Sequence, residues 1–450
     1  MTANSDIAII LHKMKKVIVI GAGAAGLLAS IAAVQNGAKV ILLEKNAVGA
    51  QKILISGKGR CNLSNSCSME KFLAAFGTNG RFLRGAFSRF FRENLRDLLN
   101  SLGVPTKEER GGRIFPQSDK SQDVVDALIK HAKDSGVNIA YNCSVRTVLH
   151  KNGEVYGVRV DNGELLADAV IICCGGASFP KTGSNGDGFN LAKECGHTIT
   201  ALLPALVPLV VQEKETVLTA QGVSLKNVRL SLYTCQAQEA PLLSPTQDYG
   251  HGILGKSPKA PLLESRFGEM MMTHFGLSGP IALIESLAAA KALSLKQTIS
   301  AVIDLKPALS LKELDKRLQR EIESHPKRSY QNLLKELAPL KLSSMLQKLS
   351  GIDPFLPSCD IQKEQRQALA QLLKRVPFNI SNTLPLSMAM VTSGGIELNE
   401  IDPKTMASKK IKGLYMAGEV LNIDADTGGF NLQAAFSTGF VAGTFAAQEN

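Results

Sequence analysis

The chain has 450 residues, a length that predicts two or three domains rather than one compact core. Its residues are 44% hydrophobic and 20% charged, which excludes an intrinsically disordered chain, and no run reaches the roughly 18–20 apolar residues of a membrane span. The net charge of +11 permits a polyanionic partner such as RNA or DNA without requiring one.

The eight cysteines show no C-x-x-C spacing, so we expect neither a metal site nor a thioredoxin-like pair. Free thiols suit a reducing compartment, and we therefore expect a cytoplasmic protein without a membrane partner. Residues 1–13 lack the pattern of a secretory signal and are interpreted as an extension before the first strand. The sequence indicates no particular oligomeric state.

Residues 17–20 are an apolar run typical of a buried strand, and the spacing Gly21-x-Gly23-x-x-Gly26 follows at once. Gly21 allows a tight turn, Gly23 lets a pyrophosphate approach the backbone, and Gly26 lets the next helix pack closely on the strand. The free amides at the start of that helix would face the phosphates. The pattern predicts a dinucleotide-binding site.

A second apolar run at 39–43 ends in Glu44, close to the distance of roughly 20 residues expected of a ribose-binding acid. The Glu44 carboxylate would accept hydrogen bonds from the hydroxyls of an adenosine ribose. An acid at this position argues against a 2′-phosphate, so FAD or NAD would fit. The alternative is an ordinary βαβ unit with an exposed glutamate.

Residues 81–102 are predicted to form one helix with a solvated arginine face, or alternatively a helix that faces an anion near the substrate. A helix and four strands are predicted next, at 122–132, 137–141, 145–149, 154–160 and 164–167. The buried strand at 169–174 ends at Gly175 and Gly176. A glycine pair there lets the backbone pass close to a cofactor.

From about Leu206 short alternating strands predict a β-barrel-like insert, interrupted by a polar linker at 244–260. Residues 306–375 are helical and basic, with 14 Lys and Arg against 8 Asp and Glu. A short strand and a glycine-rich helix start then return to the first domain. The predicted domains are a FAD-binding domain at 15–205, a β-rich insert at 206–305, a helical module at 306–375, and the second FAD-binding segment at 376–450.

Four segments together resemble one family: Gly21–Gly26, Lys52–Asn62, Thr182–Gly188 and Gly413–Asn431. From Lys15 onward the chain resembles the BaiN/RdsA group of NAD(P)/FAD-dependent oxidoreductases, which are also described as aminoacetone-oxidase-like flavoproteins. The resemblance implies an α/β fold with a Rossmann-like FAD-binding domain in two segments, an inserted β-barrel-like domain and a small helical domain. It implies FAD in the first glycine-rich site.

The resemblance also implies which residues bind FAD. They are Gly21, Gly23, Ala24, Ala25, Gly26, Glu44, Lys45, Lys52, Gly57, Arg60, Cys61, Asn62, Val145, Gly175, Gly176, Gly418, Glu419, Gly428, Gly429, Asn431 and Leu432. Amides at the start of the last helix would stabilise negative charge on the reduced flavin ring. A plain capped helix is the alternative.

Three residues are predicted to take part in catalysis. Arg60 would hold the pyrophosphate or polarise the flavin, and Cys61 would donate a proton to a substrate carbon or serve only as a packing residue. His274 is a second candidate proton donor, or a structural hydrogen-bonding residue. The substrate-side residues implied by the resemblance are Lys181, Thr182, Ser184 and Arg113.

Family members include a bile-acid-intermediate reductase, proteins described as aminoacetone oxidases, and a ribosomal RNA dihydrouridine synthase. With one dinucleotide fingerprint, NADH or NADPH is expected to visit the flavin and leave before the substrate binds. The leading hypothesis is reduction of a uridine in 23S ribosomal RNA or a ribosome precursor, with hydride passing from flavin N5 to uracil C6. The alternatives are a small-molecule flavin reductase or amine oxidase, and an RNA-binding assembly factor with structural FAD.

Overall fold

The computed structural model describes residues 14–240 and 260–448. Its contacts divide the chain into two compact units, one that ends at Leu202 and resumes at Ser393, and one that spans Leu203–Thr392. Residues 1–13, which the sequence suggested are an extension, lie outside the described residues. So does the predicted linker at 244–260, except for its last residue. Within the described ranges, no helix is long and apolar enough to cross a membrane.

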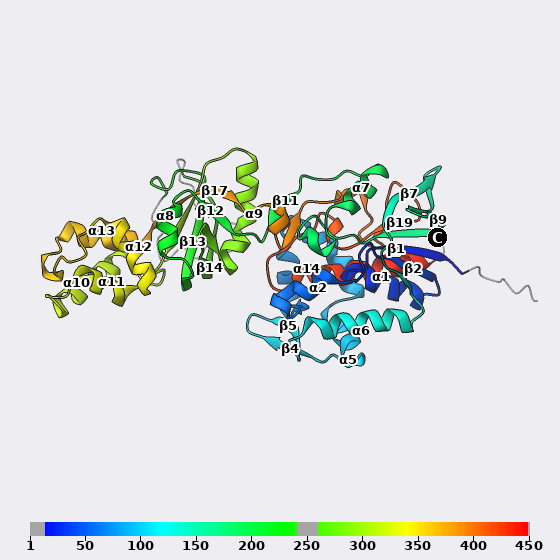
Figure 1. The fold of residues 1–450 in the computed structure, drawn as a ribbon, viewed down its shortest axis with the longest axis horizontal. Coiled ribbons are helices and arrows are strands. Elements are labelled where there is room, and N and C mark those ends of the chain that lie inside the picture. The colour runs from blue at the N-terminus through cyan, green and yellow to red at the C-terminus, as the bar shows by residue number, and fades with distance from the viewer. Residues whose placement is uncertain (1–13, 241–259, 449–450) are drawn as a thin grey trace, which may run out of the picture. The chain divides into compact units, whose positions relative to one another are not determined.

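The first unit is built on a parallel five-stranded sheet in the order β19-β10-β1-β2-β6 (Figure 1). The strands are β1 (Lys16–Ile20), β2 (Lys39–Leu43), β6 (Asn138–Ala140), β10 (Ala169–Ile172) and β19 (Leu414–Met416). Apolar runs without alternation form β1, β2, β10 and β19, because both faces of a parallel sheet are covered, whereas the edge strand β6 is less buried. β19 joins β10 from the far end of the chain, which confirms the Rossmann-like domain in two segments.

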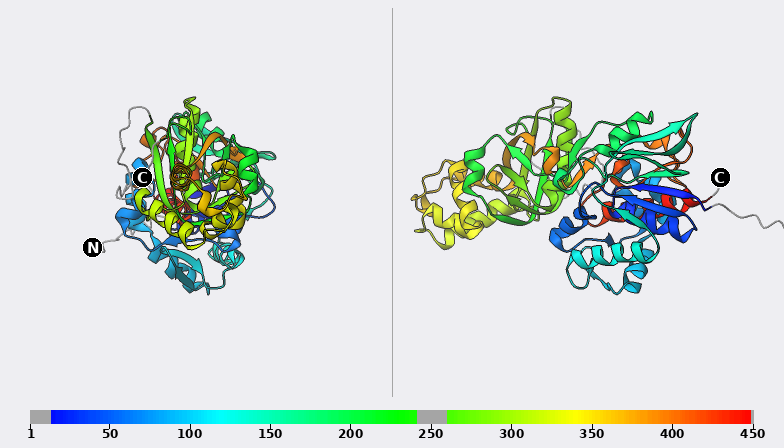
Figure 2. Two further views of the ribbon diagram at one scale, coloured as in Figure 1. Left: turned by 90° about the vertical axis from the view of Figure 1, so that its left-hand side faces the viewer. Right: turned by 45° about the vertical axis from the view of Figure 1, so that its right-hand side comes forward.

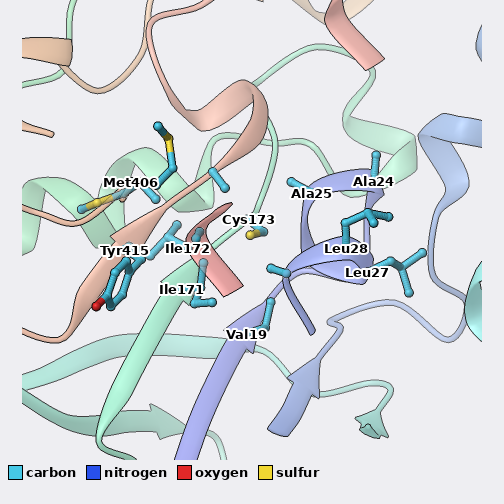
Figure 3. Close-up of a cluster of buried hydrophobic side chains, with 14 of the residues drawn as sticks. Val19, Ala24, Ala25, Leu27, Leu28, Ile171, Ile172, Cys173, Met406 and Tyr415 are labelled. Atoms are coloured by element: carbon cyan, nitrogen blue, oxygen red, sulfur yellow. The ribbon is translucent and has the colours of Figure 1, made fainter. Parts of the chain in front are cut away.

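Two nearly apolar helices pack closely beside this sheet, α1 (Ala24–Gln35) and α14 (Phe430–Ala447). A Cβ built on Gly443 of α14 would lie 2.0 Å from the carbonyl oxygen of Ala29, and Gly439 is equally close to α1 one turn earlier. These glycines therefore let the two backbones touch. Figure 3 shows side chains from α1, β1 and β10 in the buried cluster that this packing completes.

The remaining elements of the first unit surround these layers. They are α2 (Gln51–Ile55), α3 (Met69–Ala74), α4 (Arg84–Arg89), α5 (Arg92–Ser101), α6 (Ser121–Asp134), α7 (Asp187–Glu194), a sheet of β3 (Ser64–Asn65), β5 (Arg113–Pro116) and β4 (Thr106–Glu109), and a meander of β7 (Val145–Lys151), β8 (Glu154–Val160) and β9 (Gly163–Leu166). The predicted helix at 122–132 and the predicted meander are confirmed by α6 and by β7 to β9.

The single helix predicted at 81–102 is wrong. The chain leaves the helical conformation at Phe90, and α5 begins only after Phe91, whose amide donates to Asn94 Oδ1 (2.9 Å). The break places the Phe91 ring against Phe72 and Phe87 at centroid distances of 5.0 and 5.1 Å. Aromatic packing and a helix cap thus outweigh the continuous amphipathic pattern of this segment.

The second unit contains a closed antiparallel barrel in the order β12-β15-β14-β13-β16-β17. Its strands are β12 (Leu209–Val211), β13 (Ser224–Tyr233), β14 (Leu262–Met272), β15 (Gly276–Ser278), β16 (Ile299–Asp304) and β17 (Val376–Thr383). Two short strands, β11 (Leu203–Ala205) and β18 (Val391–Ser393), pair separately, and the helices α8 (Lys214–Thr219) and α9 (Pro280–Ser294) accompany the barrel. The predicted β-barrel-like insert is confirmed.

The basic helices are α10 (Leu311–Ser324), α11 (Tyr330–Leu337), α12 (Leu340–Ser350) and α13 (Lys363–Lys374). They gather at one end of the barrel (Figures 1 and 2) and share one hydrophobic core with it, so barrel and helices form one unit. The predicted boundary at 376 also differs from the structure. β17 closes the barrel by pairing with β12 and β16, and the chain returns to the first unit at Ser393.

Candidate cofactor site and active site

The turn between β1 and α1 has the geometry that its glycines predict. Gly21 has φ +100°, and a Cβ built on Gly26 would lie 1.8 Å from the Gly21 carbonyl oxygen. A Cβ on Gly23 would meet no atom within 4 Å among the described residues, so the start of α1 faces open space there. Among the described residues, no side chain caps the N-terminus of α1. Its first amides, including those of Ala24 and Ala25, are available to an anion.

Glu44 lies at the end of β2 beside this turn, and its side chain is buried with 7% exposure. Its two carboxylate oxygens accept hydrogen bonds from the amides of Ala22 and Asn46, both at 2.9 Å. Val145 begins β7 close by, since the amide of Cys143 donates to the Glu44 carbonyl (2.9 Å). This is the position from which a carboxylate binds an adenosine ribose.

A second polar group lies where β10 and β19 end at the same edge of the sheet. Lys52 Nζ donates to Glu419 Oε2 (2.6 Å) and to Ser178 Oγ (2.7 Å), and Ser178 Oγ donates to Glu419 Oε1 (3.2 Å). Lys52 and Glu419 were predicted from the resemblance. Ser178 was not, although its place two residues after Gly176 at a strand end was a usable signal.

The start of α14 is held by asparagines. The side-chain amide of Asn62 lies 3.1 Å from the Gly429 nitrogen, and the amide orientation that satisfies both of its ends has Oδ1 accepting from Gly429 and Nδ2 donating to the Ser64 carbonyl. Asn65 Nδ2 donates to the carbonyls of Gly428 and Gly111, both at 3.1 Å. Gly429 has φ +95°, and a Cβ there would lie 2.3 Å from a backbone oxygen of β3. Sequence reasoning missed Asn65, which follows the Arg60-Cys61-Asn62 motif by three residues.

Asn431 contacts its own loop. Its Oδ1 accepts from the Ala425 amide and its Nδ2 donates to the Ala425 carbonyl, both at 2.9 Å. This reciprocal pair closes the turn that leads into α14, and Leu432 follows in the first helical turn. In the described residues no side chain caps α14, so its first amides remain available to a negatively charged ring edge.

Arg60 lies differently from its prediction. Its guanidinium pairs with Glu109 and with Asp119 (2.7 Å) and stacks on the Phe115 ring at 4.2 Å. The hydrogen bonds that its guanidinium donates, to Glu109 above all and then to Asp119, raise the pKa of Arg60. Because both carboxylates compensate its charge, the structure favours a role in holding the loop over contact with a pyrophosphate.

Cys61 is fully buried, and its backbone has φ +61°. Burial raises the pKa of the thiol to about 12, with a hydrogen bond to Ser56 as a smaller opposing effect. A proton donor has to reach the substrate, and this side chain contacts the core instead. The structure therefore favours the packing role that the sequence left as the alternative. Gly57 packs against the same loop, since a Cβ there would lie 2.8 Å from the Asn62 amide.

The predicted substrate loop is partly turned inward. Thr182 Oγ1 donates to the Phe179 carbonyl (2.8 Å), whereas Lys181 is exposed. Ser184 is buried, and a Cβ on Gly175 would lie 2.9 Å from its hydroxyl. Ser184 is thus brought beside the strand end that carries Gly175 and Gly176.

Three further residues predicted from the sequence make contacts within the protein. Lys45 Nζ pairs with Asp187 at 2.6 Å and also donates to Asn185. Gly418, with φ +80°, lies against α1 and its amide donates to Thr438 Oγ1 of α14 (3.0 Å). His274 belongs to the second unit and contacts the Phe275 ring, so its role as a proton donor stays a prediction.

The arrangement fits FAD. The uncapped start of α1 lies at Gly23, which has open space before it, and the buried Glu44 carboxylate lies at the end of the neighbouring strand. The uncapped start of α14 lies beside the Asn62 loop. A model of the HI0933-like protein Rossmann domain matches residues 15–445. The chain belongs to this family. It is accordingly an FAD-dependent oxidoreductase, as the resemblance in the sequence implied.

Curated relatives in the HI0933-like family match nearly the whole chain. The 3-dehydro-bile acid delta(4,6)-reductase of Clostridium scindens is 31% identical over 97% of this chain and 100% of its own length. The ribosomal RNA dihydrouridine synthase of Escherichia coli is 29% identical over 94% of this chain and 95% of its own length. The protein of the same name from Haemophilus influenzae is 27% identical over 94% and 96%.

Among solved structures, the 3-ketosteroid-delta4-(5alpha)-dehydrogenase of Rhodococcus jostii RHA1 aligns over 98% of this chain and 99% of its own, with a TM-score of 0.49 and 16% identity.

Proposed function

We propose that this member of the HI0933-like family reduces a uridine in 23S ribosomal RNA to dihydrouridine in the cytoplasm, with NADH or NADPH as the electron donor. The observation that carries the proposal is full-length similarity to two ribosomal RNA dihydrouridine synthases. The net charge of +11 supports it, because RNA binding relies on neutralising phosphates. The excess of positive charge in residues 306–375 offers one such surface.

Bound FAD would supply two-electron transfer between the nicotinamide and the substrate. The first amides of α1 would hold its pyrophosphate, and Glu44 would accept its ribose hydroxyls. Lys52 and Ser178 would orient the Glu419 carboxylate toward the sugar-like chain of the cofactor. The amides at the start of α14 would stabilise negative charge at the ring edge.

The buried Cys61 thiol is a poor source for the proton that a reduced uracil also needs. Ser184 and Thr182 are hydroxyl-bearing residues predicted on the substrate side, and His274 is a candidate from the second unit. We assign the substrate-side role to the loop that carries Lys181, Thr182 and Ser184, with Arg113 as a further contact.

A second candidate function is reduction of a conjugated ketone. It is favoured by the 31% identity to the bile acid reductase, which slightly exceeds the identity to the RNA enzymes. In that case the positive charge would serve another purpose or none, and no RNA contact would be needed.

One experiment separates the two candidates. The purified FAD-loaded protein is reduced with NADH or NADPH, and either unmodified 23S ribosomal RNA or a conjugated 3-dehydro bile acid is added without oxygen. The proposal expects the RNA to restore the absorbance of oxidised flavin and to gain dihydrouridine by mass spectrometry. Reoxidation by the bile acid alone would overturn the RNA substrate and support the second candidate.

A further inference from the structure

The hairpin of β4 and β5 presents two arginines at its tip. The turn contains Arg110, Gly111 and Gly112, and Arg113 begins the second strand. Both glycines have positive φ, +81° and +73°, so residues without side chains make the turn. Arg113 Nε donates to the Arg110 carbonyl (3.1 Å), which keeps the two exposed residues on the same turn.

In the part of the chain that the structure describes, the two arginines at the tip lack carboxylate partners, whereas the basic residues at the base of the hairpin have them. Glu109 and Asp119, on the hairpin and just beyond it, pair with Arg60 and Lys107. Among the described residues, neither Arg110 nor Arg113 has a carboxylate within 4.0 Å. Exposed guanidinium groups without a carboxylate partner are available to an anion, which can accept several hydrogen bonds from them.

Two carboxylates of β4 lie near the tip. Glu109 is the register partner of Arg113, but its carboxylate pairs with Arg60 and Lys107. Glu108 Oε1 accepts from Ser66 Oγ at 2.7 Å, next to the strand β3. Both carboxylates thus have other partners, which leaves the tip positive. The tip is therefore a cationic element with a defined backbone rather than a solvated charge run.

The tip is joined directly to the candidate cofactor site. Asn65 Nδ2 donates to the carbonyl of Gly111 in the turn and to that of Gly428, one residue before the N-cap of α14. The Ser66 amide donates to the Gly112 carbonyl (2.7 Å), and a Cβ on Gly112 would lie 2.8 Å from the Asn65 and Ser66 side chains. Two side chains thus fix the turn beside the loop where a flavin ring edge would lie.

We propose that Arg110 and Arg113 form a phosphate-binding element at the edge of the cofactor site. The phosphate would belong to a molecule that approaches the flavin, either the 2′-phosphate of NADPH or a phosphodiester of the RNA beside the uridine. Arginines suit both sources, because a guanidinium binds phosphate oxygens in a bidentate fashion. The RNA source rests on the function proposed above, and the nicotinamide source does not.

The test uses the FAD-loaded full-length protein with Arg110→Gln and Arg113→Gln combined. The control removes the same charge elsewhere on the first unit, by Lys133→Gln and Lys193→Gln, two exposed residues. Flavin reduction is measured with NADPH and with NADH. Binding of a 23S ribosomal RNA fragment is measured at several salt concentrations.

A KM for NADPH raised about tenfold, with NADH and RNA unchanged, would assign the tip to the 2′-phosphate. An RNA dissociation constant raised about tenfold, with a salt dependence lowered by about one to two phosphate contacts, would assign it to RNA. Equal behaviour of the variant and the control in both assays would overturn the proposal. A wild-type protein that binds no RNA would refute the proposed substrate while the nicotinamide assay still tests the tip.

Discussion

At the residue scale, the cofactor site separates positions that serve the fold from positions that serve the ligand. Gly26 lies against the Gly21 carbonyl, so its missing Cβ is needed whether or not a cofactor binds. Gly23 has open space before it and an ordinary φ of −88°, so its missing Cβ matters only to something that approaches from outside. The close packing at Gly26 agrees with what the motif predicts, whereas the approach of a pyrophosphate to Gly23 stays a prediction.

Gly23→Ala is predicted to leave the unfolding temperature of the cofactor-free protein within about 1 °C of wild type and to weaken FAD binding about tenfold or more. Gly26→Ala is predicted to lower the unfolding temperature by several degrees and to abolish FAD retention. Thermal unfolding without FAD and titration with FAD measure the two effects. A destabilised Gly23→Ala protein that binds FAD normally would contradict this account of the turn.

His197 and Glu400 form a largely buried hydrogen bond that no sequence motif predicted. His197 Nδ1 lies 3.0 Å from Glu400 Oε2, and Lys410 Nζ donates to Glu400 Oε1 (2.6 Å). Burial alone would raise the pKa of Glu400, but hydrogen bonds from Lys410, Thr198 and His197 lower it to about 2. The carboxylate therefore stabilises the fold above its ordinary pKa of 4.5, and that contribution is lost as the pH falls from 4.5 toward 2.

Glu400→Gln is predicted to reduce the free energy of unfolding at pH 7 by on the order of 2 kcal/mol. The difference from wild type should shrink as the pH is lowered from 4.5 toward 2. Denaturant unfolding at a series of pH values measures it, with Glu194→Gln at an exposed position as the control. A constant difference across that pH range would show that charge is not the cause.

At the element scale, the sequence predicts elements well where local pattern and packing agree. The apolar runs of β1, β2 and β10 and the turn-bounded meander of β7 to β9 needed no long-range information. The prediction of one helix at 81–102 was wrong because aromatic residues of α3, α4 and the start of α14 pack together and interrupt a continuous amphipathic pattern. The predicted domain boundary at 376 differs from the structure because β17 closes the barrel by pairing with strands that are distant in the sequence.

A buried ion pair joins the last of the basic helices to a barrel strand, in addition to the shared hydrophobic core. Lys374, at the end of α13 and 3% exposed, lies 2.6 Å from Asp304 at the end of β16. Its Nζ also donates to the carbonyls of Lys306 (3.0 Å) and Leu309 (2.8 Å). Burial raises the pKa of Asp304, so the lysine is what allows an ionised carboxylate there.

Lys374→Met is predicted to lower the free energy of unfolding by about 3–5 kcal/mol, because it leaves a buried carboxylate and two carbonyls without a partner. Adding Asp304→Asn should restore part of the loss. Urea denaturation measures both, and Lys363→Met at the exposed start of α13 is the control. An effect no larger than that of the control would refute the importance of the pair.

At the scale of the whole molecule, the sequence predicts the division of the FAD-binding domain into two segments, because a glycine-rich helix start near the C-terminus follows a short strand. Side-chain partners could not be predicted. Arg60 and Asn431 belong to the family motifs, yet their contacts are with Glu109, Asp119 and Ala425. The partners of Arg60 come from segments 49 and 59 residues away, and that of Asn431 from a loop conformation six residues away that spacing does not specify. A motif names residues without either kind of neighbour.

We propose that this FAD-dependent oxidoreductase acts on 23S ribosomal RNA. The most direct test compares dihydrouridine in purified 23S ribosomal RNA from a strain without the gene, from the wild type, and from the deletion strain that carries the gene again, by mass spectrometry. We predict that the modification is lost in the deletion strain and restored by the wild-type gene, but not by the Gly26→Ala gene. An unchanged level of dihydrouridine in the deletion strain would contradict the claim.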